Sequence, residues 1–204
     1  ETDFLQGGYE VDRLIAFDKS FKEFVKDLSY KDIWENNFHS FNSRILLSYS
    51  WPLRSFPNYA QQLEMESLGK PANPKSIFKK TSQTIFGGFG PKAQHSYFQQ
   101  LHQGTENYSV DLFSNREDRV DEKLISKQLQ AQLTLFKNCP RELKGSQEEV
   151  KANVNFNHFE LAKIDPFHLG YLIALWEYRT FITAKILQIN PFCLLYTSDA
   201  ADDM

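Results

Sequence analysis

The chain has 204 residues, of which 41% are hydrophobic and 24% are charged, and its formal net charge is −3 at neutral pH. This length and composition are typical of a soluble protein of one domain or slightly more, and the charge excludes a global basic field that would attract nucleic acid. No apolar stretch is long enough to predict a membrane span, and two cysteines without a CxxC pair argue against a disulfide framework or a zinc site, so we expect a cytoplasmic protein.

Helical and extended patterns alternate along the chain. Leu14, Phe17, Phe21 and Phe24 recur at three- and four-residue steps, which predicts one helix over 3–28 that Ser29 ends. The later predicted elements are a buried strand at 44–49, a helix at 57–67 capped by Gly69, a strand at 83–87, a tight turn at 87–91, a helix at 93–103, a strand at 108–113, a helix at 119–137, a polar irregular stretch at 138–163 and an apolar helix at 166–187.

Strands separated by helices predict an α/β fold, a layered sheet of mainly parallel strands with right-handed crossovers. Ligands of such sheets gather beyond the carboxyl ends of the strands. The loops at 50–58 and 87–95 each follow a predicted strand directly. We therefore expect these two loops to carry functional residues.

Glu66 is the first candidate functional residue. It lies at the end of a predicted helix, where the helix dipole disfavours a carboxylate. A solvated glutamate balanced by Lys70 is the commoner explanation for such a position. The alternative is that the Glu66 carboxylate has a functional role rather than a stabilising one.

His95 is the second candidate, and it lies where a glycine-rich turn leads into a predicted helix. An isolated histidine here is more often an ordinary early-helix residue than an acid or base. The turn itself, Gly87-Gly88-Phe89-Gly90, could cradle a phosphate, but it lacks the lysine and threonine of a P-loop and the full dinucleotide pattern. Nucleotide binding is therefore not favoured.

Several segments resemble the glucose-6-phosphate isomerase family. QQLEMESLGK at 61–70 is similar to the family pattern QQLxMESNGK, and FGGFGPKAQHSYFQQLHQG at 86–104 is similar to WGEPGTNGQHSFYQLLHQG. Further similarities are YSWPLRSFPNY at 49–59 to YDQRLHRFPAY, FLQGGYEVD at 4–12 to LLxGAxxMD, and the segment at 169–192 to LGxLIALYEHKxFVQGxIWxINxF. These matches occur in the family's order and at near-family spacing.

The resemblance implies an enzyme that interconverts D-glucose 6-phosphate and D-fructose 6-phosphate without a metal or cofactor. It implies that Glu66 moves a proton between C2 and C1 of the open-chain sugar, that Gln62 lines the substrate site, and that His95 assists ring opening. It further implies a homodimer in which His95 reaches the partner's site, and an incomplete three-layer αβα sandwich of the sugar isomerase (SIS) type. On this basis we expect Glu66 to face the crevice at the carboxyl edge of the sheet.

The sequence departs from the family pattern at several places, one of them Leu68, where the family has Asn. Gly88-Phe89 replaces Glu-Pro and Pro91-Lys92-Ala93 replaces Thr-Asn-Gly, so the turn before His95 should change shape, and Lys92 would add positive charge near the phosphate. Residues 193–204 do not follow the family pattern, and we interpret 1–192 as the carboxy-terminal SIS domain and 193–204 as a non-native tail.

The family's phosphate loop, its arginine and its catalytic lysine have no counterpart in the chain. The chain would then cover somewhat under half of the enzyme and be inactive alone. Two alternatives remain open: a non-catalytic module that binds sugar phosphates, and an isomerase that also accepts mannose 6-phosphate.

Overall fold

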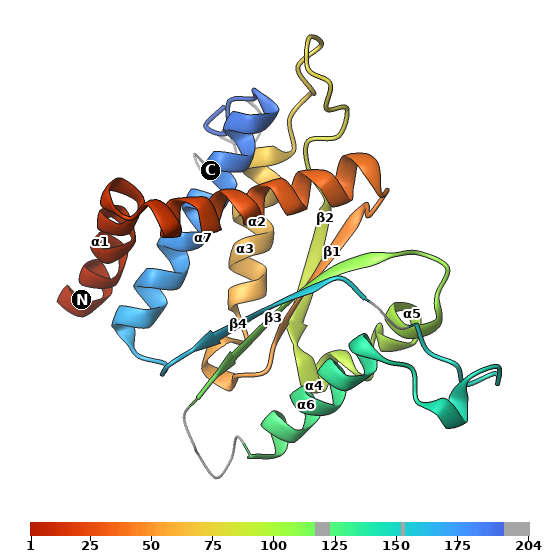
Figure 1. Ribbon diagram of the computed structural model, residues 1–204. Helices are drawn as coiled ribbons and strands as arrows, with labels where there is room; N and C mark the ends of the chain where they lie inside the picture. The colour runs from red at the N-terminus through yellow and green to blue at the C-terminus, as the bar shows by residue number, and fades with distance from the viewer. Residues whose placement is uncertain (117–122, 152–153, 194–204) are drawn as a thin grey trace, which may run out of the picture.

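The computed structural model describes residues 1–116, 123–151 and 154–193. Its sheet has four strands, all parallel, in the order β2-β1-β3-β4 (Figure 1). The strands are β1 Ser43–Ser48, β2 Thr84–Phe89, β3 Tyr108–Asn115 and β4 Phe156–Leu161. The sequence therefore predicted the parallel α/β class correctly.

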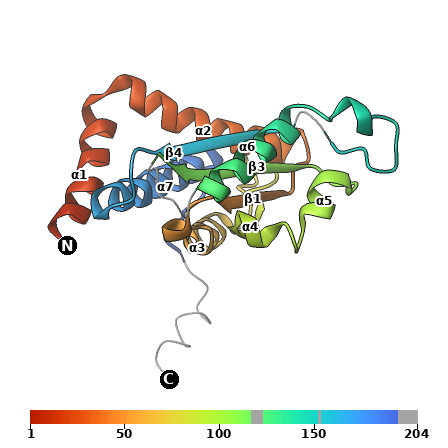
Figure 2. The same cartoon turned by 90° about the horizontal axis from the view of Figure 1, so that it is seen from below.

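Helices cover both faces of this sheet. They are α1 Thr2–Phe17, α2 Lys19–Phe38, α3 Phe56–Leu68, α4 Gly90–Ala93, α5 Phe98–Gln103, α6 Lys123–Lys137 and α7 Pro166–Leu187, with short 3-10 turns at Trp51–Leu53 and Arg141–Leu143. The helices α2, α3 and α7 lie on one side of the sheet with α1 outside them, and α4, α5 and α6 lie on the other (Figure 1). Figure 2 shows α1 beside α7 and far from α5. The predicted three-layer αβα sandwich is confirmed.

Two apolar cores separate the three layers. Alternate residues of β1 point to opposite faces, so Ile45 and Leu47 belong to one core and Leu46 to the other. The core beneath α5 and α6 is built from Ile45, Leu47, Tyr49, Ala93, Phe98, Leu101, Val110, Leu112, Leu129 and Phe136. The core beneath α3 and α7 is built from Leu46, Leu53, Phe56, Ala60, Ile85, Phe113, Leu172 and Trp176.

The single helix predicted over 3–28 is wrong, because the chain forms two helices there. Asp18 has an extended backbone and its side chain accepts a hydrogen bond from the Phe21 amide at 3.0 Å, so it caps the start of α2. Ser29 does not end the run either. Its hydroxyl is buried and donates to the carbonyl of Val25, which lets α2 continue to Phe38.

Three further boundaries differ from the prediction. The strand β2 continues through the expected turn to Phe89, and the helix expected at 93–103 is divided into α4 and α5 by a turn at 94–97. The stretch expected to be irregular contains β4, a half-buried edge strand. Of the helix expected at 119–137, residues 119–122 lie outside the described part of the chain, as do residues 194–204 of the expected tail.

The direction of α3 determines where the candidate residues lie. Since α3 connects two parallel strands, it begins beyond the carboxyl end of β1 and runs back toward the end at which the strands start. Phe56 therefore lies near the carboxyl edge and Leu68 near the opposite edge. No helix in the described ranges is long and apolar enough to cross a membrane.

Candidate active site

A cavity of about 440 Å³ lies beyond the carboxyl ends of β1 and β2. Both loops singled out from the sequence line it, the first following β1 and the second following β2. The lining residues are Trp51, Arg54, Ser55, Asn58, Gly87, Gly88, Phe89, Lys92, Ala93, Ser96 and Tyr97. The two loops therefore meet at this edge of the sheet.

Glu66 does not line this cavity. The exposed side of α3 carries Asn58, which lines the cavity, then Gln62 and Glu66 one and two turns further on. At 1.5 Å per residue Glu66 lies about 12 Å along the helix from Asn58. The Gln62 amide donates to the Glu66 carboxylate at 3.3 Å, and both side chains are exposed. The expectation that Glu66 faces the crevice at the carboxyl edge is therefore wrong for a single chain.

His95 lies in the turn between α4 and α5 rather than in a helix. Its amide donates to the Lys92 carbonyl at 3.2 Å, and its side chain is exposed. The turn follows the carboxyl end of β2, whereas Glu66 is near the opposite end of α3. One chain thus positions Gln62 beside Glu66 but does not bring His95 to them.

The last residues of β2, just before α4, include a backbone that only glycine adopts readily. Gly88 has a φ of +155°, a conformation that L side chains rarely take. The Glu of the family pattern would not readily fit this backbone.

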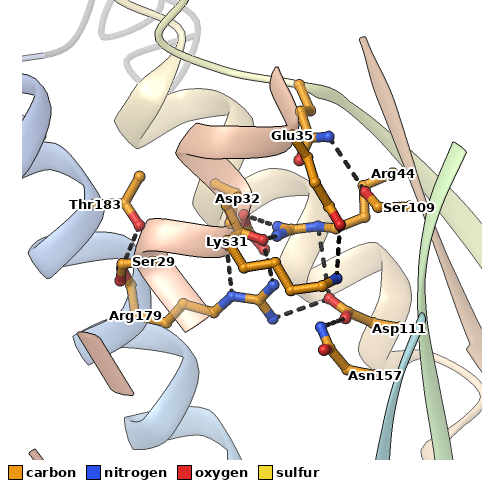
Figure 3. Close-up of polar contacts among 12 residues, drawn as sticks. Ser29, Lys31, Asp32, Glu35, Arg44, Ser109, Asp111, Asn157, Arg179 and Thr183 are labelled. Carbon is orange, nitrogen blue, oxygen red and sulfur yellow. Dashed lines mark hydrogen bonds and ion pairs between the residues drawn. The ribbon is translucent and has the colours of Figure 1, made fainter. Parts of the chain in front are cut away.

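A buried charged network lies beneath α3 and fixes its orientation (Figure 3). Arg44 in β1 forms ion pairs with Asp32 of α2 and Glu64 of α3. Glu64 also accepts a hydrogen bond from the Trp176 indole at 2.7 Å. Because Glu64 points into the core, Glu66, two residues later on the helix, points to solvent.

Arg179 of α7 closes the network. Its guanidinium donates to both oxygens of Asp32, at 2.8 and 2.6 Å, and to Asp111 of β3 at 2.9 Å (Figure 3). Asp111 in turn accepts from the Asn157 amide at 2.6 Å. The network therefore connects α2, α3 and α7 to three of the four strands.

The network has one carboxylate more than it has guanidiniums, since Asp32, Glu64 and Asp111 face Arg44 and Arg179. Burial raises the pKa of Asp32, but the two guanidiniums outweigh burial and bring that pKa below its usual range. Burial also raises the pKa of Glu64, and there Arg44 offsets it only in part. Glu64 thus gains a proton more readily than Asp32.

The sequence interpretation missed this network. The available signal was a charged residue inside a predicted strand or apolar helix: Arg44 in the predicted buried strand, Asp111 in the strand predicted at 108–113, and Arg179 in the apolar helix. A charged residue in such a segment is almost never fully buried unless it is paired. Arg44, Asp111 and Arg179 are each at most 1% exposed.

Within the described ranges, no three His, Cys, Asp or Glu side chains are arranged to hold a metal ion.

Comparison with known proteins gives one consistent family. The family model described as phosphoglucose isomerase matches residues 2–195. A glucose-6-phosphate isomerase of Legionella pneumophila is 33% identical over 194 residues, covering 94% of this chain and 38% of that protein. One of Albidiferax ferrireducens is 33% identical over 198 residues, covering 93% of this chain and 37% of that protein.

A solved structure agrees with the sequence relatives. The crystal structure of a glucose-6-phosphate isomerase from Chlamydia trachomatis superimposes with a TM-score of 0.85 at 25% identity, covering 98% of this chain and 41% of that one. The chain thus spans well under half the length of the relatives it matches.

Proposed function

Because the chain belongs to the phosphoglucose isomerase family, we propose that the whole protein interconverts D-glucose 6-phosphate and D-fructose 6-phosphate, a step of glycolysis and gluconeogenesis. In this proposal Glu66 is the base that moves the proton, Gln62 contacts the substrate and His95 assists ring opening. The family match over residues 2–195 is the observation that carries the proposal.

The reaction needs a proton removed from C2 of the open-chain aldose, next to the carbonyl. One carboxylate takes that proton and leaves an enediolate, the hydroxyl proton of O2 moves to O1, and the carboxylate returns its proton to C1 while C2 becomes the carbonyl. No electrons leave the sugar, because the carbon oxidised and the carbon reduced belong to the same molecule. A second acid or base must first open the sugar ring, and histidine titrates in a suitable range.

The local geometry supports these roles for α3. The inward ion pair of Glu64 and the packing of Trp176 hold the helix so that Gln62 and Glu66 share its outer side. A rigid helix supported by buried contacts is a favourable place for a catalytic base. The Gln62 amide, 3.3 Å from the carboxylate, can orient it before the sugar binds.

The proposal includes a homodimer. A catalytic carboxylate works best in a partly desolvated pocket, where its pKa comes closer to working pH. Glu66 is exposed on the single chain and His95 lies toward the other end of the sheet. We therefore propose that a second copy covers Glu66 and brings its own His95 to the site, in a cytoplasmic protein whose residues 1–192 form an SIS domain.

The test uses a hybrid enzyme in which residues 1–192 replace the matching segment of a complete member of the family. Glu66→Gln should lower kcat by about a thousandfold or more, because the amide cannot accept the C2 proton. Isomerisation is measured with both sugar phosphates, together with exchange of the C2 hydrogen in deuterated water.

Glu23→Gln is the matched control, since Glu23 is an exposed helical glutamate paired with Lys26 outside the proposed site. It should leave both rates unchanged. If Glu66→Gln keeps isomerase activity within about tenfold of the parent, Glu66 is not the base.

A further inference from the structure

A second cavity, far smaller than the first, lies at the opposite edge of the sheet beside the buried charged network. Its lining includes Asp32 and Asn36 of α2, Arg44 near the start of β1, Glu64 of α3 and Thr183 of α7. Its volume is about 10 Å³, close to the smallest that holds one water molecule. A sugar, a phosphate or a peptide side chain is too large for this cavity.

Two polar side chains of its wall have hydrogen-bonding capacity left over. The Oδ1 atom of Asn36 is buried and accepts no hydrogen bond from the described residues, and Asn36 as a whole is 3% exposed. The Nη1 atom of Arg44 is in ion-pair contact with Asp32 but donates no hydrogen bond within the described part of the chain. Nearly all buried polar atoms of folded proteins bond to a protein group or to ordered water. An unmatched acceptor and an unmatched donor thus belong to side chains that line one cavity.

The charges around the cavity favour a neutral ligand. Asp32 and Glu64 would repel an anion, whereas Arg44 and Lys80 would repel a cation, and all four residues line the cavity. The ligand must also donate a hydrogen bond to Asn36 and accept one from Arg44. Water is a neutral molecule of the right size that can do both.

The loop before β2 completes the cavity with its residues 80–83, and this loop is fixed to α2. The Asn37 side-chain oxygen accepts hydrogen bonds from the amides of Lys79 and Lys80 at 2.9 and 3.0 Å. The Asn37 side-chain nitrogen donates to the Lys80 carbonyl at 2.9 Å, and the Gln83 side chain donates to the Phe41 carbonyl at 2.8 Å. The cavity is therefore a fixed feature of the fold rather than a gap between loose segments.

We propose that this cavity binds one water molecule as a fixed component of the charged network. The water donates one hydrogen bond to Asn36 Oδ1, accepts one from the Arg44 guanidinium and donates its second hydrogen to a carboxylate of the network. A buried water typically makes about three such bonds. The water thereby links α2, β1 and α3 at the edge where the strands start. The inference does not depend on the proposed isomerase reaction.

A crystal structure of the 204-residue protein, at a resolution that shows ordered water, tests the site directly. Density for one water should lie within hydrogen-bonding distance of both Asn36 Oδ1 and the Arg44 guanidinium. This measurement on the parent protein decides the question even where a variant fails to fold.

The variant Asn36→Leu distinguishes a hydrated cavity from a dry one by the sign of its effect on stability. Leucine has a branched shape similar to that of asparagine, fills the cavity and offers no acceptor. With water bound in the parent, the variant loses the bridge and leaves the Arg44 donor unmatched. The equilibrium constant for unfolding, measured in urea, should then rise about tenfold, the effect of losing one hydrogen bond to a charged group. In a dry cavity leucine would replace an unmatched buried amide, and the constant would fall.

Asn107→Leu is the matched control, because Asn107 is exposed before β3 and does not line the cavity. It should change the unfolding constant about twofold or less. The proposal is overturned by density in which no water joins Asn36 to Arg44, or in which Asn36 Oδ1 bonds directly to a protein group. An unfolding constant of Asn36→Leu below that of the parent would overturn it as well.

Discussion

At Gly87 the neighbouring strand leaves no space for a side chain. It lies in β2 opposite Leu46 of β1, and a Cβ added to it would come within 1.9 Å of the Leu46 carbonyl oxygen. A backbone oxygen of a central strand cannot rotate away. We therefore expect Gly87→Ala to lower the free energy of unfolding by about 3 kcal/mol, measured by urea denaturation.

Gly8→Ala is the matched control, because the nearest atom to an added Cβ there is 4.0 Å away, on Ala174. Gly8 lies inside α1, so alanine should stabilise the protein by about 0.5 to 1 kcal/mol. If both substitutions changed stability equally, the close approach of β2 to β1 at Gly87 would not be real.

The roles proposed for Glu66 and His95 come from motifs and not from geometry. Their positions in the predicted elements made both residues candidates, and the resemblance of their surrounding segments to a family supplied the roles. The sequence pattern predicted that Glu66 lies in a helix, but it did not predict which face of the helix Glu66 occupies. That face is set by the buried ion pair of Glu64 with Arg44. Such a contact joins residues far apart in the sequence, so local patterns do not reveal it.

At the level of elements, apolar runs with clear boundaries were predicted well. The strand at 44–49, the helix begun by Pro57 and the helix begun by Pro166 all appear within two residues of their expected ends. The break at Asp18 was missed because apolar residues continue at helical spacing on both sides of it. The strand β4 was missed because it is half-buried and alternates polar with apolar residues only weakly.

The network between elements predicts a dependence on pH. Burial raises the pKa of Glu64, so the folded state holds this proton more tightly than the unfolded state, where glutamate titrates near about 4.3. Through this group the wild-type protein gains stability as pH falls from the raised pKa toward 4.3. The Glu64→Gln variant cannot gain this stability, because its side chain does not take up a proton. Its amide oxygen can still accept the hydrogen bond from the Trp176 indole.

Stability of Glu64→Gln relative to wild type should therefore decrease as pH is lowered from about 8 to about 5, measured by denaturant unfolding at each pH. Glu23→Gln should show no such decrease, because the pKa of exposed Glu23 is lowered by its hydrogen bond with Lys26. A relative stability of Glu64→Gln that stayed constant or rose across this range would show that Glu64 is fully ionised in the fold.

At the scale of the whole molecule, the proposed site is incomplete in one chain. The chain spans 38% of the length of a matched relative, and its Glu66 is exposed to solvent. Large apolar side chains are also exposed on α2 and in the loop before β2, including Trp34, Phe38 and Ile77. The fold thus presents a scaffold whose proposed chemistry depends on surfaces supplied by more polypeptide or by a second copy.

A shared site makes a quantitative prediction for mixed dimers. If His95 acts in the partner's site, a heterodimer of Glu66→Gln and His95→Asn chains has one site with both native residues and one with neither. Random reassembly of equal amounts makes about half the dimers mixed, so activity should recover to about a quarter of the parent value. The two variants are prepared in the hybrid enzyme, unfolded together, refolded and assayed for isomerisation. If Glu66 and His95 served the same chain, every site would keep one defect, and the mixture would remain as inactive as either variant alone.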